Sequence, residues 1–351
     1  MTIKITLLIT FFISLIFFYT SFFTEASTPE TAIDKVWWEG LSAEWKTIFL
    51  INQNLARQKA DIYLIQKEYI NRLNPDKDEI SGMNKSLHDL FEEQKFSLSY
   101  NDFYARAIRK KHIVQRDSID LETLGQLQTL YIVGGPGDLS PLLKFPNLRV
   151  LIINYCGIGY DIPLKKQVLD LEPLRKLTNL QVLHCSSTTV KSLDPIRNLV
   201  NLEELLCDNT NVTTLDALKK LIKLRKLSFG ANVIKAKVSH LENIEELYVK
   251  GCKSISSLSS LKRLKKLSIA ENEYAIVNGS YRVTSLSFIK DLSSLEFLDL
   301  GGISYRGSLL MLNGLQNLKA VTLPGVNGAQ FAEFGSNHKN CLIINLFEFI
   351  R

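Results

Sequence analysis

Histidine and cysteine, the side chains that most often supply catalytic bases and metal ligands, are sparse in this chain of 351 residues. No His-x-x-x-His or Cys-x-x-Cys spacing brings two of them together as metal ligands require. No Gly-x-Ser-x-Gly motif occurs, and the glycine-rich stretch 134–137 lacks the Lys-Ser/Thr of a phosphate-binding loop. The histidines are scattered, at His88, His112, His184, His240 and His338. We therefore predict no enzyme activity, no metal site and no cofactor.

The chain repeats one sequence motif, Leu-x-x-Leu-x-(Leu/Ile/Cys/Phe)-x-x-(Asn/Cys/Thr). This repeat motif determines which residues the chain presents to a partner. Leucines three apart, with another apolar residue two positions on, predict a turn that runs into a short strand. The last residue of the motif is expected to enter the core at the bend that follows the strand. A spacing of three in the second half of each repeat predicts a 3₁₀ or short helical turn. Copies begin at Leu127, Leu148, Leu180, Leu202, Leu224, Ile244, Leu264, Leu295 and Leu318.

This pattern resembles the leucine-rich-repeat superfamily, and its short repeats are similar to the internalin-like class of secreted and surface bacterial proteins. The resemblance covers residues 121–326. It implies an α/β fold, a right-handed solenoid with a parallel sheet on one side and short helical or 3₁₀ turns on the other. Residues 159–169 and 273–284 depart from the period and are predicted to form loops, often placed beside the binding face.

Four parts of the chain are predicted. Residues 1–26 form a signal peptide or an N-terminal membrane anchor, because Lys4 precedes a run without charge and Ala26 ends a candidate cleavage site. Either alternative predicts an exported protein, whether secreted, periplasmic or at the cell surface, that touches a membrane only through residues 5–23 if they are retained. The other parts are a helical N-terminal cap region, about nine leucine-rich repeats and a C-terminal cap, at 27–116, 117–326 and 327–351.

In the cap region, the apolar residues have the spacing of a helix and the repeat motif is not found. Apolar residues over 37–50 share one helical face that Ser42 can cap, and further helices are predicted over 55–73, 85–94 and 101–111. Because an open first repeat would expose its core and a strand edge, we expect these helices to cover it. We interpret the tryptophans as cap core, with an aromatic ligand platform as the alternative: Trp37, Trp38 and Trp45. At the other end, a short helix over 330–334 and a strand over 341–345 are predicted to close the solenoid.

All five cysteines follow residue 155, and the first four take positions that are Leu, Ile, Val or Asn in other repeats. An odd number at buried positions predicts reduced core thiols in place of disulfides. Cys185 and Cys207 occupy equivalent positions in adjacent repeats and are expected to be close. The net charge is +6 with a pI near 8.9, but Lys and Arg are spread through the turns, so we predict a solvated face and no nucleic-acid partner.

The outward-facing strand positions form two columns. The first contains Thr129, Val150, Val182, Glu204, Lys226, Glu246, Lys266, Phe297 and Ala320. The second contains Tyr131, Ile152, His184, Leu206, Ser228, Tyr248, Ser268, Asp299 and Thr322. Adjacent strands lie about 4.8 Å apart, so the alternating charges of the first column are predicted to pair with one another.

The apolar members of these columns predict a solvent-facing strip at the N-terminal half of the horseshoe, edged by Asn154 and Asp208. Such a surface is typical of a protein-binding site. Strand propensity, or coverage by the loop at 159–169, is the alternative explanation. The candidate ligand-binding residues are Tyr131, Val150, Ile152, Asn154, Val182, His184, Leu206, Asp208 and Tyr248.

The resemblance and these columns together indicate an exported, non-enzymatic protein that binds a protein ligand or surface polymer through its concave sheet. The alternative is a structural or assembly protein, in which the Trp-rich helices dock to a membrane-associated complex and the repeats act as a spacer. A hydrolase hidden in residues 34–116 is a third hypothesis, but the carboxylates there resemble ordinary surface residues.

Overall fold

The computed structural model describes residues 33–57, 119–132, 137–156, 168–230, 232–233, 236–250, 255–256, 258–269, 286–301, 303, 305, 307–323 and 328–345. The leader, the helices predicted over 85–94 and 101–111, and the loop at 273–284 lie outside these residues. So do most of the helix predicted over 55–73 and most of the loop at 159–169. Within the described residues, no helix is long and apolar enough to cross a membrane.

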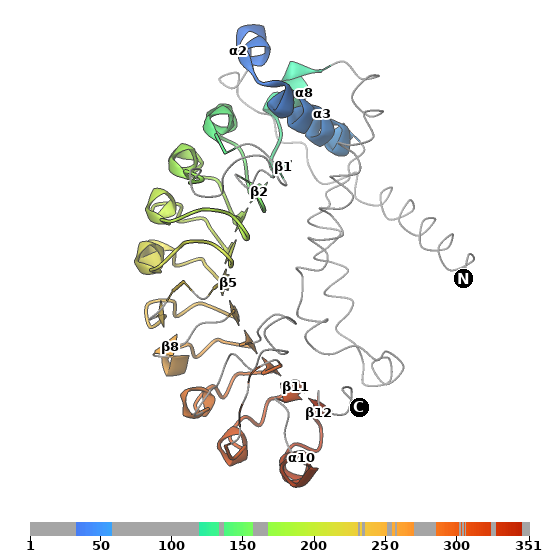
Figure 1. The fold of residues 1–351 in the computed structure, drawn as a ribbon, viewed down its shortest axis with the longest axis vertical. Helices are drawn as coiled ribbons and strands as arrows, with labels where there is room; N and C mark the ends of the chain where they lie inside the picture. The colour runs from blue at the N-terminus through green and yellow to red at the C-terminus, as the bar shows by residue number, and fades with distance from the viewer. Residues whose placement is uncertain are drawn as a thin grey trace, which may run out of the picture.

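Ten parallel strands form one open sheet along the concave side of a curved solenoid (Figure 1). Nine of them begin two residues after the first Leu or Ile of the nine predicted repeats, and the tenth follows the last repeat. The α/β solenoid with a parallel sheet is therefore confirmed. The strands are β1 Thr129–Tyr131, β2 Val150–Ile152, β3 Val182–His184, β4 Glu204–Cys207, β5 Lys226–Phe229, β7 Glu246–Val249, β9 Lys266–Ser268, β10 Phe297–Asp299, β11 Ala320–Leu323 and β12 Leu342–Asn345.

The strand register is the one that the sequence columns predict. Thr129 pairs with Val150, Val182 with Glu204, and Lys226 with Glu246, and the pairing continues from Phe297 to Ala320. Each column therefore runs straight across the sheet. A slip of one residue would turn the leucines outward, so their burial fixes this register.

The convex side consists of 3₁₀ turns, which confirms the interpretation of the three-residue spacing (Figure 1). Three of them carry proline as their second residue, where its fixed φ suits the first turn of a helix. The turns are η2 Ser140–Lys144, η3 Glu172–Lys176, η4 Asp194–Ile196, η5 Asp216–Lys220, η6 Leu258–Ser260, η7 Ser287–Ile289 and η8 Leu310–Leu312. Two short strands, β6 Ala236–Lys237 and β8 Ile255–Ser256, form a second sheet that the sequence did not predict.

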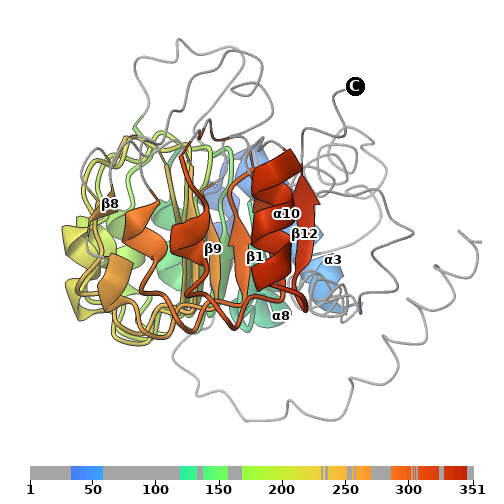
Figure 2. The ribbon, with the colours of Figure 1, turned by 90° about the horizontal axis from the view of Figure 1, so that it is seen from below.

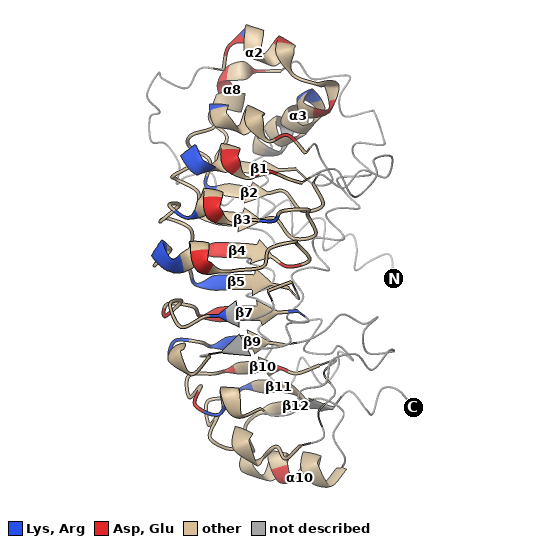
Figure 3. Ribbon diagram, turned by 60° about the vertical axis from the view of Figure 1, so that its left-hand side comes forward, with Lys and Arg blue, Asp and Glu red and all other residues tan. Residues whose placement is uncertain are grey.

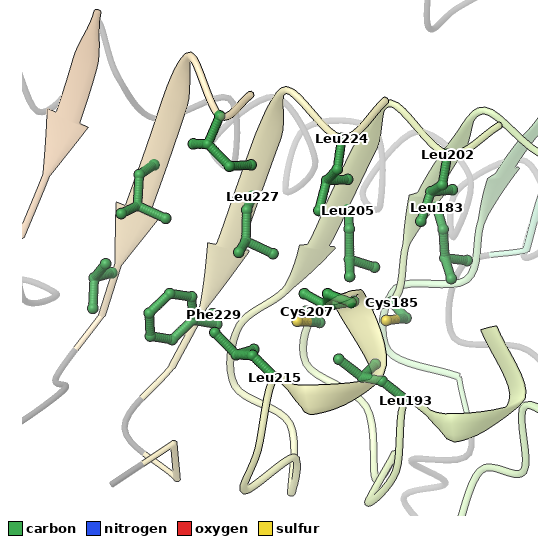
Figure 4. Packing of buried hydrophobic residues seen from close by; sticks show 14 of the residues in the cluster. Leu183, Cys185, Leu193, Leu202, Leu205, Cys207, Leu215, Leu224, Leu227 and Phe229 are labelled. Atoms are coloured by element: carbon green, nitrogen blue, oxygen red, sulfur yellow. The ribbon is translucent and has the colours of Figure 1, made fainter. Parts of the chain in front are cut away.

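The core lies between the sheet and the 3₁₀ turns and repeats from level to level (Figure 4). Strand residues such as Leu183, Leu205 and Leu227 are fully buried, and turn residues such as Leu193 and Leu215 close the layer from below. The last residue of the repeat motif also enters this core at Cys156, Thr188 and Thr210, as predicted, whereas Asn232 is exposed. The hydroxyl, amide or thiol of this last residue bonds a backbone carbonyl, as seen at Cys156, Thr188, Thr210 and Asn232.

One flank of the solenoid carries a ladder of amide side chains that the sequence analysis missed. Each of these asparagines directly precedes the first apolar residue of a repeat, and its amide nitrogen donates to a carbonyl of the preceding repeat. The bonds join Asn179 to Pro146 (3.1 Å), Asn201 to Thr178 (3.0 Å), Asn243 to Ile222 (2.8 Å) and Asn317 to Ser293 (2.7 Å). They tie neighbouring repeats together outside the sheet.

Among the described residues, three helices lie at the N-terminal end: α2 Lys35–Gly40, α3 Ala43–Arg57 and α8 Leu121–Gly125. Ser42 caps α3 as predicted, accepting from the backbone amide of Trp45 at 3.2 Å. Trp45 is 3% exposed and stacks on Phe49, and the Phe49 ring stacks in turn on Phe145 of the first repeat. Trp45 therefore packs as cap core, and Trp37 and Trp38 are partly buried against that core.

The α3 helix also covers the outer edge of the sheet. Asn52 is buried, and its side chain accepts from the amide of Tyr131 at 2.8 Å and donates to the carbonyl of Tyr131 at 2.9 Å. These two bonds replace the missing strand at the edge of β1. Gln53 accepts from the amide of Asp120 at 2.8 Å, which fixes the entry to α8 beside α3.

The C-terminal end is closed by α10 Gly328–Asn337 and β12, which match the predicted helix and strand. In the view along the solenoid, α10 crosses the end of the last repeat beside β12 (Figure 2). Phe334 is buried there and stacks on His338, with ring centroids 4.1 Å apart.

Candidate functional site

The N-terminal half of the concave face differs from the surface that the sequence predicts. Four of its apolar side chains are almost fully buried: Tyr131 at 2% exposed, Ile152 at 5%, Val182 at 7% and Leu206 at 7%. We call these four residues the N-terminal strip. Val150 beside them is partly exposed. The expectation of a solvent-facing strip is therefore not met, because side-chain direction on the sheet does not by itself determine exposure.

The charges of the first column form pairs along the sheet, as predicted. Lys226 lies 3.4 Å from the Oε1 of Glu204, and Lys266 lies 2.9 Å from the Oε1 of Glu246. Figure 3 shows the acidic β4 beside the basic β5 in this arrangement. His184 joins the first pair, with its Nε2 2.6 Å from the same oxygen of Glu204. The ladder therefore satisfies its own charges over four strands.

The second column adds Tyr248 to this ladder. Its hydroxyl donates to the Oε2 of Glu246 at 3.0 Å, and the ammonium of Lys226 lies 5.7 Å from the centroid of its ring. Burial alone would raise the pKa of the Glu246 carboxyl, but Lys226, Lys266 and the hydroxyl of Tyr248 together lower it below its ordinary value. Glu246 is therefore held as a carboxylate on the concave face.

A buried polar network lies where β3 to β5 end. Asp208 is fully buried, and its Oδ1 accepts from the hydroxyls of Ser186 at 2.7 Å and Ser228 at 2.9 Å. The ammonium of Lys250 is 3.8 Å from its Oδ2. Asn154, 5% exposed, accepts from the amide of Ser186 at 2.9 Å. Asn154 and Asp208 were predicted as the rim of a binding strip, and the structure places both in this network between repeats.

A second apolar cluster lies on the C-terminal half of the concave face, separate from the main core. It consists of buried Ala320 with partly exposed Tyr248, Phe297 and Leu342. We call these four residues the C-terminal patch. The ammonium of Lys266 lies 5.8 Å from the ring centroid of Phe297. Sequence reasoning named only Tyr248 of this set, although Phe297 and Ala320 stand in its columns, and Leu342 comes from a strand outside the nine copies.

The cysteines match the prediction of reduced core thiols at every position that the structure describes. Cys156, Cys185 and Cys207 are buried thiols, and Cys341 is a partly buried thiol. Burial raises the pKa of the Cys185 and Cys207 thiols, and the nearby carboxylate of Asp208 adds to this effect. These thiols are therefore held in the unreactive protonated form.

The parallel sheet, the 3₁₀ turns and the level-by-level leucine core define a solenoid repeat protein. The chain belongs to the leucine-rich repeat region family, whose model matches residues 126–327, more than half of its length. No curated protein sequence matches the chain.

Several solved structures have a similar fold. The internalin InlF of Listeria monocytogenes is 18% identical, with 67% of this chain and 86% of that chain covered and a TM-score of 0.35. The internalin InlC2 of the same organism is 21% identical, with coverage of 57% and 73% and a TM-score of 0.36. A complex of TLR13 with the RNA ssRNA13 is 16% identical over 65% of this chain and 38% of TLR13, with a TM-score of 0.46.

Proposed function

We propose that this protein is an exported, non-enzymatic binding protein that engages a protein ligand or surface polymer through its concave sheet. The C-terminal patch is the observation that carries the proposal. It is an apolar cluster outside the main core, its aromatic members are partly exposed, and it lies on the concave face of the solenoid. Membership of the leucine-rich repeat family supports a role as a binding scaffold.

The chemistry of the patch suits a protein surface. Aromatic rings that combine apolar area with limited conformational freedom are frequent anchors in protein interfaces. Glu246 and Lys266 of the charged ladder lie beside them and are partly exposed, so they supply an acceptor and a donor for orientation. A ligand across both would bury Tyr248 and Phe297 while its polar groups meet Glu246 and Lys266.

The candidates from sequence divide between the two halves of the face. His184 and Tyr248 lie along the ladder and are partly exposed, so they remain candidate contacts. Direct contact with the N-terminal strip would require those side chains to be uncovered first. Ligand binding by Asn154 and Asp208 would require the hydrogen bonds between their repeats to break.

Export belongs to the same proposal and rests on the apolar run over residues 5–23. Mass spectrometry of the protein recovered from its native cells tests it. A new N-terminus close to residue 27 in an extracytoplasmic fraction supports cleavage and export. An intact N-terminus in the membrane fraction supports an anchor, and an intact chain confined to the cytosol would refute export.

Affinity capture from the native cell surface tests the binding role. The tagged full chain is compared with a patch variant, Tyr248→Ser with Phe297→Ser, and with Ile222→Ser as the matched control. Ile222 is an apolar residue, 70% exposed, that follows the convex turn η5. We expect the parent and the control to retain a common partner that the folded patch variant loses. Equal capture by all three would refute a site at the patch.

A further inference from the structure

The two edges of the ten-stranded sheet end differently. At the outer edge of β1, the side chain of Asn52 bonds both backbone groups of Tyr131, so a further strand is kept from pairing there. At the other end β12 is the last strand, and among the described residues it pairs with β11 alone (Figure 3). One edge is therefore blocked, and the other has the geometry to accept a strand.

The backbone of β12 directs one set of hydrogen-bonding groups away from the sheet. The amide of Leu342 donates to the carbonyl of Lys319 at 2.8 Å, so the backbone groups of Leu342 face β11. These groups alternate in direction along a strand, so those of Ile343 and Asn345 face outward. Within the part of the chain that the structure describes, no hydrogen bond reaches them from the outer side. Such an edge is a template for pairing with another strand.

The core behind this edge is also incompletely covered. Val321 of β11 and Leu298 of β10 are fully buried, whereas Ile343 at the same register position is partly exposed. Ile343 packs against the main core beside α10, where Phe331 is likewise only partly buried. A strand added to β12 would cover Ile343 as each strand of the solenoid covers the one before it.

A second copy of this chain has the chemistry to occupy the edge. Antiparallel pairing of two identical strands is self-complementary, because each residue meets the same partner in both directions. Residues 340–347 carry no charge and contain no proline, so the pairing brings no like charges together and no residue that blocks it. Each copy also brings the partly exposed Ile343 to the same seam.

We propose that β12 is a dimer interface, in which the edge strands of two copies pair antiparallel about a twofold axis. Ile343 of one copy lies opposite Asn345 of the other, so that their outward backbone groups bond one another. The two sheets then become continuous, both concave faces lie on the same side, and the two C-terminal patches become neighbours. This inference concerns the free protein and does not depend on the proposed ligand.

Sedimentation velocity of the full chain over a range of concentrations tests the proposal. Asn345→Pro removes an outward amide hydrogen and keeps the preceding residue extended, as a strand requires. Asn345→Ala is the matched control, because it changes the side chain and retains that hydrogen. We expect the parent and Asn345→Ala to form dimers, and Asn345→Pro to dimerise about tenfold more weakly or not at all. A monomeric parent, or an Asn345→Pro variant that dimerises as the parent does, would overturn the proposal.

Amide hydrogen exchange locates the interface without relying on the proline variant. In the parent, exchange at Ile343 and Asn345 should slow as the concentration rises and dimers form, while exchange at Val321 in β11 should stay the same. In Asn345→Pro, Val321 should remain protected, which shows that the sheet is intact. A dimeric parent whose exchange at Ile343 does not change with concentration would place the interface elsewhere and refute pairing through β12.

Discussion

Asp208 shows how one buried carboxylate holds several repeats in place. Its oxygens accept from serines on either side, and Lys250 lies within ion-pair distance. A charge in this position is costly unless its partners remain, because burial removes its hydration. The network spans consecutive repeats, so its geometry depends on their stacking in register.

Replacing this carboxylate is therefore expected to destabilise the solenoid. Asp208→Ala leaves the hydroxyls of Ser186 and Ser228 without their acceptor and should lower the free energy of unfolding by about 3 kcal/mol. The matched control is Asp216→Ala, which removes a carboxylate paired with exposed Lys219 on the convex side and should have little effect. Urea unfolding followed by circular dichroism measures both. Equal stability of the two variants would contradict a structural role for the network.

The buried thiols predict how stability responds to alkaline pH. Burial raises the folded-state pKa of Cys185 and Cys207, whereas an unfolded thiol ionises near its ordinary value of about 8.5. The unfolded state therefore releases protons first, and stability present below that pH is lost as the pH rises, by up to about 1.4 kcal/mol per pH unit for each thiol.

The test compares the parent with Cys185→Ala by urea unfolding between pH 7.5 and pH 10. We expect the variant to lose less stability than the parent over this range, because one ionising thiol has been removed. Parallel curves would mean that Cys185 ionises equally in both states.

At the scale of elements, α3 acts as a substitute for a missing strand. A sheet edge without a partner exposes backbone donors and acceptors, and Asn52 supplies both groups to Tyr131. Most of the cap stability on this side is expected to come from the aromatic stack of Trp45, Phe49 and Phe145. The amide of Asn52 adds alignment between helix and strand.

Asn52→Ala is expected to loosen this edge. The loss of two buried hydrogen bonds to Tyr131 should cost about 2 kcal/mol. Amide hydrogen exchange at Tyr131 should accelerate, while exchange at Leu298 in β10 should stay unchanged. Thr47→Ala, which removes an exposed bond within the same helix, serves as the control. Unchanged exchange at Tyr131 would show that Asn52 does not protect the edge.

The elements of the repeats could be predicted because one local pattern fixes them. The repeat motif around Leu183 specifies the strand, its register and its core residues together. The pairing of Val182 with Glu204 therefore followed from the spacing of the leucines alone. The short sheet of β6 and β8 could not be predicted, since its two-residue strands have no periodicity. The asparagine ladder could have been found from sequence, because an Asn precedes the first apolar residue of the repeat at 179, 201, 243 and 317. The spacing of apolar residues, from which the strands were predicted, takes no account of these polar positions.

At the scale of the whole molecule, the two halves of the concave face could not be told apart from sequence. The column rule places Ile152 and Phe297 on the same surface, and the structure agrees on their direction. The exposure of these side chains depends in addition on contacts with distant parts of the chain, which the repeat motif does not encode. This is why the candidate site moves from the N-terminal strip toward Tyr248 and Phe297.

The most direct test of this account is hydroxyl-radical footprinting of the full chain, alone and with the partner recovered by affinity capture. In the free protein we predict strong labelling of Tyr248 and Phe297 and weak labelling of Tyr131, Ile152 and Leu206. Addition of the partner should reduce labelling at Tyr248 and Phe297 and leave the N-terminal strip unchanged. Strong labelling of the strip in the free protein, with loss there and not at the patch when the partner binds, would contradict the account.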